Sequence, residues 1–308
     1  MPGYSDAPDT CSDTPDMRKH VAACLQSSAV EHGGFKANAY RKAAAAVLAA
    51  APFADEHGAR RALKLTGRMM QHVIDTLSAG GAAESAAGRL AQVSCIGPVA
   101  AKRLAALGVT DVDDLRSRAA DVGLTAAQTV SLTHHEDIQQ RIPREEMLWH
   151  ERVISAAGAK TACVVTVTGS FRRGEGSSGD IDVLLVGNLE RFLQELREQS
   201  YIVGALAEGG HKFMGVARLH ESATVRRLDV LSTKSDVMPF ALLHFTGPAE
   251  YNVVLRKRAI TKGWSLSERG LVGPGAPTSL CTERDVVEAL GVEYDAPDAR
   301  SGALRFIP

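Results

Sequence analysis

Two aspartates at the start of an apolar run are the residues of this sequence best suited to chemistry. Asp180 and Asp182 stand two positions apart at the start of Ile181-Asp182-Val183-Leu184-Leu185-Val186, a run typical of a β-strand. Because side chains alternate along a strand, both carboxylates are expected on one face of the sheet. Adjacent carboxylates repel each other unless a cation separates them, and Mg²⁺ binds one or two carboxylates together with water and phosphate oxygens. The pair therefore predicts a site for Mg²⁺, with Mn²⁺ as the alternative ion.

The loop that precedes these aspartates offers groups that bind phosphate. It begins at Gly169-Ser170, continues through Arg172-Arg173-Gly174, and ends at Ser177-Ser178-Gly179. Serine hydroxyls, arginine guanidinium groups and the backbone N–H groups of glycine-rich segments are common phosphate ligands. Asp-x-Asp alone is a frequent pattern, but its combination with this loop is far more specific. Together they predict a cradle for a metal-bound triphosphate.

The full string Gly-Ser-Phe-Arg-Arg-Gly…Gly-Asp-Ile-Asp from Gly169 to Asp182 resembles the nucleotidyltransferase signature of the family X DNA polymerases, the DNA polymerase beta group. The wider nucleotidyltransferase superfamily shares only Gly-Ser…Asp-x-Asp, so the longer string narrows the resemblance. Downstream, Arg227 and Asp229 alternate in a second apolar run, Val225–Leu231. At this distance Asp229 matches the third catalytic aspartate of the family. The resemblance implies an α+β fold and two Mg²⁺ ions held by three carboxylates, with Asp229 as the acceptor of the primer 3′-OH proton.

The resemblance also assigns binding roles to residues outside the carboxylates. The nucleotide-binding candidates are Arg141, Ser170, Arg173, Ser178, Gly179, His244, Phe245, Gly247 and Asn252. The DNA-binding candidates are Lys36, Tyr40, Gly97, Lys102, Lys212, Arg227 and Arg256. For Arg141, which precedes Ile142-Pro143, a purely structural salt bridge is the alternative role.

The pattern along the chain divides it into five segments. Residues 1–16 form an acidic stretch without periodicity, which predicts a disordered tail. Helical patterns fill 17–87 and 88–140, which we expect to be a 5′-phosphate-binding domain and a helix–hairpin–helix DNA-binding subdomain. A catalytic palm is expected over 141–235, and a smaller α+β subdomain that selects the nucleotide over 236–308.

The first helical segment resembles the polymerase beta domain that grips a DNA 5′-phosphate and, in many members, removes a deoxyribose phosphate through a lysine Schiff base. Asn38-Ala39-Tyr40-Arg41-Lys42-Ala43 carries this resemblance. Aligning Gly67–Asp75 with the family pattern places Val73 at the position of the Schiff-base lysine and Met69 at that of a second pocket lysine. Valine forms no imine, and Lys64 and Lys36 are the remaining nearby amines. We expect lyase activity to be absent or severely reduced.

The second helical segment contains Val93-Ser94-Cys95-Ile96-Gly97-Pro98, which resembles a helix–hairpin–helix turn. In such a turn backbone N–H groups face DNA phosphates, and the family adds a monovalent cation there. Cys95 replaces the usual first glycine, and a plain helix-capping turn is the alternative interpretation.

The segment from Leu243 to Asn252 resembles the part of the family that borders the sugar and base of the incoming nucleotide. His244 stands where tyrosine is usual, while Pro248 and Ala249 replace serine and aspartate. The wall that distinguishes deoxyribose from ribose is therefore altered, and an enzyme that also accepts ribonucleotides stays an alternative.

Composition excludes several classes of protein. Among 308 residues, 45% are hydrophobic and 23% charged, no run is long enough to span a membrane, and the N-terminus lacks a signal-peptide pattern. Five scattered cysteines favour a reduced, intracellular protein. In a eukaryotic host we expect it in the nucleus, and a viral origin stays open. The net charge of −1 does not itself predict DNA binding, but Lys36 to Arg68 is locally basic. A monomer is expected.

These observations predict a template-directed DNA polymerase that fills short gaps in DNA during base excision repair, using dNTP and gapped or nicked DNA with a 5′-phosphate. A template-independent, RNA-directed or ribonucleotide-tolerant nucleotidyltransferase is the alternative within the same chemistry. A non-catalytic protein that binds gapped DNA is the alternative from another class, and it would require the loss of a catalytic carboxylate.

Overall fold

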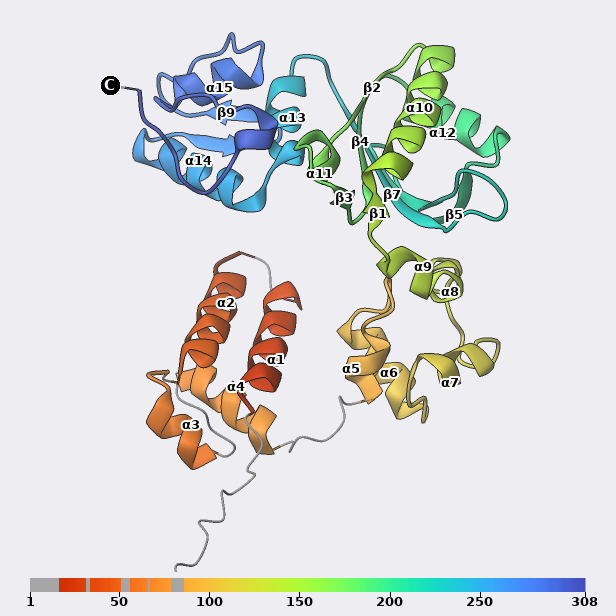
Figure 1. Cartoon of the computed structure of the whole chain (residues 1–308), viewed down its shortest axis with the longest axis vertical. Coiled ribbons are helices and arrows are strands. Elements are labelled where there is room, and N and C mark those ends of the chain that lie inside the picture. The colour runs from red at the N-terminus through yellow and green to blue at the C-terminus, as the bar shows by residue number, and fades with distance from the viewer. Residues whose placement is uncertain (1–16, 32–33, 51–55, 66, 79–85, 308) are drawn as a thin grey trace, which may run out of the picture. The chain divides into compact units, whose positions relative to one another are not determined.

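A computed structural model describes residues 17–31, 34–50, 56–65, 67–78 and 86–307 of the chain (Figure 1). The expected tail at 1–16 lies outside the described residues. The chain divides into two compact units: Met1–Arg89 with Pro98–Ala106, and Leu90–Gly97 with Leu107–Pro308.

The first unit is helical. It contains α1 (Arg18–Glu31), α2 (Gly34–Ala49), α3 (Glu56–Ala62) and α4 (Gly67–Ser78), most of α5 (Ala86–Leu90), and α6 (Pro98–Ala106). The alanine-rich run in α2 favours a helix because alanine has the highest helix propensity. Small and branched apolar side chains from α1 to α4 form one core, with Val21, Val47 and Val73 fully buried.

Three short helices of the second unit lie before its sheet: α7 (Val112–Ser117), α8 (Ala126–Thr133) and α9 (His135–Gln139). Asp111 caps α7 by accepting a hydrogen bond from the Asp114 N–H, and Thr125 with Gln128 forms a capping box on α8. Helix α8 packs on β5 (Ile202–Glu208), where a Cβ added to Gly204 would lie 2.8 Å from Val130 Cγ1. This close approach ties α8 to the sheet.

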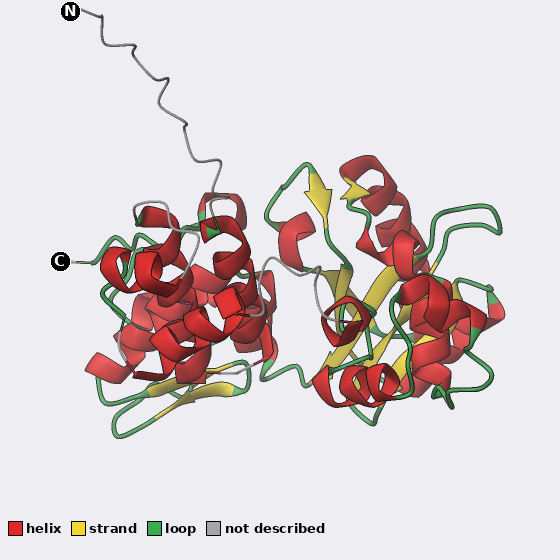
Figure 2. Cartoon of the chain, turned by 90° about the horizontal axis from the view of Figure 1, so that it is seen from below, coloured by secondary structure: helices red, strands yellow, loops and turns green. Residues whose placement is uncertain are grey.

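The centre of the second unit is a five-stranded mixed sheet. Its strands are β2 (Val164–Val167), β4 (Ile181–Val186), β5, β6 (Lys212–Ala217) and β7 (Arg226–Thr233), in the order β2-β4-β7-β6-β5. Only the β4–β7 pair is parallel. Helices α10 (Arg144–Thr161) and α12 (Leu189–Glu198) pack side by side and share a core with the sheet (Figure 1). The strands are drawn in yellow in Figure 2. The α+β prediction is confirmed.

Three short elements precede β4 in the chain. Strand β1 (Ile142–Pro143) pairs with β3 (Ser177–Ser178), and the one-turn helix α11 (Gly169–Arg172) begins directly after β2. The pairing of β1 with β3 therefore brings together the two ends of the segment that contains α10, β2 and α11.

The C-terminal part contains α13 (Met238–Thr246), α14 (Ala249–Thr261), the hairpin β8 (Ser265–Ser267) and β9 (Gly270–Val272), α15 (Glu283–Ala289) and η1 (Pro297–Ala299). It has its own core, in which Tyr251 and Leu255 are fully buried. Helix α13 contacts both α11 and β4, which places this part beside the Gly-Ser loop (Figure 1). Among the described residues, no helix is both long and apolar enough to cross a membrane.

Candidate active site

Parallel pairing of β4 and β7 brings the predicted carboxylates together. Asp182 lies directly opposite Asp229 in the register of the two strands. Asp180 lies in a bend just before β4, so only Asp182 of the pair belongs to the strand itself. The observed start of β4 agrees with the strand expected from the sequence, Ile181–Val186. The charge of Asp180 still acts on Asp182.

Two basic side chains from the same sheet lie against the carboxylates. Arg227 Nη2 donates to Asp180 Oδ2 at 2.8 Å, and its Nε lies 3.4 Å from Asp229 Oδ1. Lys212 Nζ lies 3.9 Å from Asp229 Oδ2. The predicted alternation of Arg227 and Asp229 thus places both on one face, and Arg227 partly neutralises two of the three aspartates.

The electrostatics show that this compensation is incomplete. Burial, followed by the charges of Asp180 and Asp229, raises the pKa of Asp182 to about 7. Burial is also the main cause that raises the pKa of Asp229, against the opposing charges of Arg227 and Lys212. Asp229 Oδ1 and Arg227 Nε are both buried, and neither makes a hydrogen bond with a described residue. The cluster has more negative charge than its own cations stabilise.

The structure shows why the Gly-Ser motif begins with glycine, at Gly169. Its φ is +58°, and a Cβ built on it would lie 2.4 Å from Asp182 Oδ2. The Thr168 N–H donates to the Asp182 carbonyl at 2.8 Å, which holds the loop against β4. Only glycine combines this backbone conformation with this approach.

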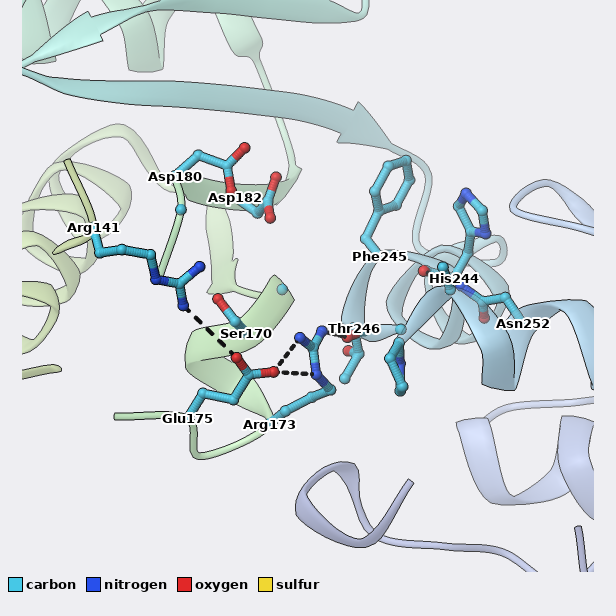
Figure 3. A pocket seen from close by; sticks show the side chains of 15 residues that line it. Arg141, Ser170, Arg173, Glu175, Asp180, Asp182, His244, Phe245, Thr246 and Asn252 are labelled. Atoms are coloured by element: carbon cyan, nitrogen blue, oxygen red, sulfur yellow. Dashed lines mark hydrogen bonds and ion pairs between the residues drawn. The ribbon is translucent and has the colours of Figure 1, made fainter. Parts of the chain in front are cut away.

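An open pocket of about 430 Å³ lies beside the carboxylates, between α11 and the start of α14 (Figure 3). Its lining contains ten of the predicted site residues: Arg141, Ser170, Arg173, Gly179, Asp180, Asp182, His244, Phe245, Gly247 and Asn252. Asp229 does not line it. Neither does Ser178, which lies in β3 with 1% of its surface exposed and its hydroxyl without a hydrogen-bond partner among the described residues.

Five further residues line the pocket without having been predicted. They are Gly169, Glu175, Thr246, Pro248 and Ala249. Four belong to the two motifs and were identified only as part of the strings. Glu175 had no signal in the sequence, because a carboxylate in a phosphate-binding loop matches no expected role.

A buried ion-pair network joins the Gly-Ser loop to the C-terminal part. Arg172 makes two hydrogen bonds to Glu283, at 3.1 and 2.7 Å, and one to Thr246 Oγ1 at 2.6 Å. Arg300, whose side chain is fully buried, donates to the same carboxylate at 2.9 Å. Arg173 Nη1 adds a 2.7 Å bond to the Thr246 carbonyl. These hydrogen bonds and ion pairs therefore hold the two walls of the pocket together.

The segment from Leu243 to Asn252 has its own hydrogen bonds. Asn252 Nδ2 donates to the His244 carbonyl at 2.7 Å, and Arg256 Nη2 lies 3.3 Å from His244 Nδ1. Because arginine only donates, Nδ1 is the acceptor and the imidazole carries its proton on Nε2. Burial and the charge of Arg256 lower the pKa of His244, which keeps the ring neutral. Its ring packs edge-on against Phe245.

The DNA-binding candidates are distributed over both units. Lys36 lies in α2, but its side chain is outside what the structure describes; Tyr40 packs edge-on against His72. Gly97 directly precedes α6, which contains the exposed Lys102. Lys212 and Arg227 lie against the carboxylates, and Arg256 is exposed on α14.

The turn before α6 contains a residue in the left-handed conformation. Cys95 adopts φ +65°, the left-handed conformation for which the family pattern has glycine. Its carbonyl accepts a 3.2 Å hydrogen bond from Gln128 Nε2, and the Ile96 N–H donates to the Val93 carbonyl at 3.0 Å. The cation predicted at this turn stays a prediction.

The donor chemistry of the three aspartates fits a hard divalent cation. All their donors are carboxylate oxygens, and burial together with the charges of Asp180 and Asp229 raises the pKa of Asp182, as expected of groups that bind a cation. As they stand, however, no three His, Cys, Asp or Glu side chains of the described part are grouped closely enough to hold a metal together. Asp229 is instead engaged by Arg227 and Lys212.

Comparison with known proteins agrees with this geometry. A family model described as the DNA polymerase beta palm matches residues 141–235, and one described as the DNA polymerase beta thumb matches residues 241–301. Together the two models match just over half of the chain.

Individual relatives point the same way. The chain is 35% identical over 221 residues to DNA polymerase lambda of Rattus norvegicus, a match that covers 63% of this chain and 38% of that protein. It is 27% identical over 254 residues to the DNA-directed DNA/RNA polymerase mu of Homo sapiens, which covers 68% of this chain and 51% of that protein. The match thus spans about half or less of the length of these relatives.

A solved structure completes the comparison. The crystal structure of Leishmania infantum polymerase beta, a ternary P/T complex, is similar with a TM-score of 0.65 and 29% sequence identity. The similarity covers 70% of this chain and 98% of that one. With the palm, the thumb, the relatives and the three paired aspartates in agreement, the chain belongs to the family X DNA polymerases.

Proposed function

We propose that this protein is a template-directed DNA polymerase that fills short gaps by transferring a nucleotide from dNTP to a primer 3′-OH, with release of pyrophosphate. The observation that carries the proposal is the pairing of Asp182 with Asp229 across β4 and β7, with Asp180 adjacent, beside a pocket lined by arginines. The relatives named as DNA polymerases, and the related ternary P/T complex, support the same assignment.

Asp180, Asp182 and Asp229 would hold the divalent ions. When bound, such ions neutralise charge on the phosphates and lower the pKa of the attacking hydroxyl. The protein's own contribution is to collect the carboxylates on one sheet and to bury them, so that in the free protein they are poorly compensated. Release from that repulsion favours cation binding.

Asp229 is the proposed acceptor of the primer hydroxyl proton. Its Oδ1 is buried without a hydrogen bond to a described residue, and burial raises the pKa of this carboxyl toward the working range of a base. Arg227 and Lys212 lie close enough to orient it and to limit that rise.

Binding of the triphosphate falls to the arginine side of the pocket. Arg141 directly precedes β1 and Arg173 directly follows α11, and both line the pocket, where Ser170 and Gly179 provide short polar groups. Guanidinium groups suit phosphate because their planar donor edges can bind two oxygens at once. His244, Phe245, Gly247 and Asn252 form the opposite wall, where we place the sugar and base.

We propose that residues 17–87 and 88–140 bind the DNA, including a 5′-phosphate at the gap, and that lyase activity is absent. The support is that Val73, at the position of the Schiff-base lysine, is fully buried in the apolar core of α1 to α4. A buried valine supplies neither an amine nor access to a sugar. Such a protein would work on DNA within the cell as a monomer, and in the nucleus of a eukaryotic host.

Borohydride trapping on a 5′-deoxyribose-phosphate substrate tests the lyase proposal. We expect no efficient covalent adduct in wild type or in Lys64→Ala, a variant that removes the exposed Lys64 amine. Efficient cross-linking of wild type would overturn the proposal, and its loss in Lys64→Ala would show that Lys64 replaces the missing lysine.

A one-nucleotide gap with a 5′-phosphate tests the polymerase proposal. We expect Mg²⁺-dependent, template-matched insertion of one dNTP by the full chain. Addition of any nucleotide without a template would instead favour a template-independent enzyme. DNA binding without extension, with either Mg²⁺ or Mn²⁺, would favour a non-catalytic gap-binding protein.

Tolerance of ribonucleotides is the second candidate, and His244 is the observation that favours it. A smaller, neutral imidazole held by Arg256 lines the sugar wall where the family pattern has tyrosine. Comparing insertion of dNTP with rNTP in wild type and His244→Tyr tests this. A larger dNTP preference in His244→Tyr supports it, and equal preferences contradict it.

A further inference from the structure

One carboxylate lies among the arginines of the phosphate-binding pocket. Glu175 Oε1 accepts from Arg173 Nε at 3.0 Å and also from Arg173 Nη2, while its Oε2 lies 3.9 Å from Arg141 Nη2. Figure 3 shows Glu175 between the two guanidinium groups, with dashed lines to both. The side chain also belongs to the pocket lining. An anion of the protein thus lies where the proposed function requires anions of the substrate.

The contact occupies the donor edge that a phosphate would use. Arg173 directs Nη1 to the Thr246 carbonyl, so its Nε–Nη2 edge is the one left for a ligand, and Glu175 covers it. Arg141 directs Nε and Nη2 to Ser177, with Glu175 at the outer side of Nη2. A triphosphate oxygen and the Glu175 carboxylate cannot both bind the same edge of Arg173.

The backbone of Glu175 is fixed while its side chain is free to leave. Its N–H donates to the Ser170 carbonyl at 3.1 Å, and its own carbonyl accepts from Arg144 Nη1 at 3.3 Å. Arg144 N also donates to the next carbonyl, that of Gly176, at 3.0 Å. The Glu175 side chain, in contrast, is 44% exposed. Displacement therefore needs only rotation about side-chain bonds into solvent and no movement of the loop.

We propose that Glu175 is an internal competitor for the triphosphate group: it holds Arg173 and Arg141 in the free protein and must be displaced when a nucleotide binds. This inference rests on the proposed function for the identity of the ligand, a nucleoside triphosphate. Glu175 keeps the arginines paired when the pocket has no ligand, and it lowers nucleotide affinity by the strength of the contacts that are broken. It is therefore an affinity-determining residue of the site.

The expected size follows from the exposure of these ion pairs. Partly exposed pairs contribute little each, so removing the competing charge should tighten binding of a polyanion by about two- to tenfold. A residue that instead oriented the arginines for the substrate would show the opposite sign, because its loss would weaken binding.

The experiment measures anion affinity directly as well as activity. Inorganic tripolyphosphate is titrated calorimetrically into the metal-free full chain as wild type, Glu175→Gln, Glu175→Ala and the control Glu190→Gln. Glu190 is exposed in the first turn of α12 and outside the pocket lining, so its variant removes the same charge from the same part of the chain. The KM for dNTP in gap filling is measured on the same four proteins.

We expect both Glu175 variants to bind tripolyphosphate about two- to tenfold more tightly and to show a lower KM for dNTP, with Glu190→Gln like wild type. Equal or weaker binding in both Glu175 variants would overturn the inference, as would an equal gain in Glu190→Gln. If wild type extends no primer while Glu175→Gln still tightens tripolyphosphate binding, the proposed function fails and the competition stands. If wild type extends primers but neither Glu175 variant gains affinity, the competition fails alone.

Discussion

Loss of the negative charge at Glu283 should destabilise the C-terminal part of the protein far more than loss of any exposed charge. The Glu283 side chain is 6% exposed and is the common acceptor for Arg172 and Arg300. In Glu283→Gln both guanidinium groups lose their counter-ion, and Arg300 is fully buried with Nη1 already lacking a hydrogen-bond partner among the described residues. Removing one partner of a buried ion pair costs about 3–5 kcal/mol, so a decrease of that order in the free energy of unfolding is expected.

The matched control is Glu288→Gln on the same helix. Glu288 pairs with Arg284 at 3.2 Å, but both side chains are well exposed, so the expected loss is under about 1 kcal/mol. The assay is urea unfolding followed by tryptophan fluorescence in a Trp149→Phe background. Trp264, which packs against the C-terminal core, is then the remaining tryptophan of the chain.

The midpoint shift at constant slope gives the change in free energy. A Glu283→Gln variant that loses no more than Glu288→Gln would refute the reasoning, because it would show that the network carries no net charge stabilisation. Glu283→Leu adds a second check. If leucine is tolerated no worse than glutamine, the unpaired arginine charge is the cause of the loss, whereas a larger loss in Glu283→Leu would assign part of it to the hydrogen bonds.

Three further predictions test residues that lie in or pack against the sheet that carries the aspartates. Burial lowers the pKa of His150 from 6.5 to about 4, so between these pH values the unfolded chain binds more protons than the folded chain. The free energy of unfolding should therefore fall by about 3 kcal/mol as the pH decreases from above 6.5 toward 4. Urea unfolding across this range should show a shallower dependence in His150→Gln, and an unchanged dependence would contradict the assignment. Gly169→Ala should reduce kcat for gap filling at least about tenfold. The new Cβ would lie only 2.4 Å from Asp182 Oδ2 and so push that carboxylate away, and alanine would be strained at φ +58°. A near-normal kcat would refute the close approach. Gly204→Val should cost about 1–3 kcal/mol of stability through its clash with Val130, whereas Gly210→Ala, with open space around its Cβ, should not; equal unfolding midpoints would argue against tight docking of α8.

The sequence identified residues of the site but not the strand order that brings them together. Asp180, Asp182 and Asp229 were identified from a motif, but nothing in the sequence showed that β4 pairs with β7, because α12, β5 and β6 intervene. Strand β5 was not predicted, since two register shifts and Gly204 interrupt its alternation. Local patterns carry period and capping, whereas strand order depends on long-range packing.

Charge networks were also beyond the reach of the sequence. Arg172 and Glu283 are separated by 111 positions and meet only after the C-terminal part folds against α11. Glu175 lies next to the motif, yet its position among the arginines depends on the turn at Gly174, where φ is +80°. By contrast, the unusual backbone of Cys95 was foreseeable, because the family pattern has glycine at that position.

The central claim is that Asp229 works with Asp180 and Asp182 in nucleotidyl transfer. The most direct test is single-turnover insertion into a one-nucleotide gap by wild type and Asp229→Asn, which retains the shape of the side chain but removes its negative charge and its basicity. Fluorescence anisotropy with the same DNA provides a parallel measure of DNA binding. We predict that insertion falls by at least about a thousandfold while DNA affinity changes little, since in the proposed mechanism this carboxylate is both a metal ligand and the proton acceptor. Insertion within tenfold of wild type would contradict the account.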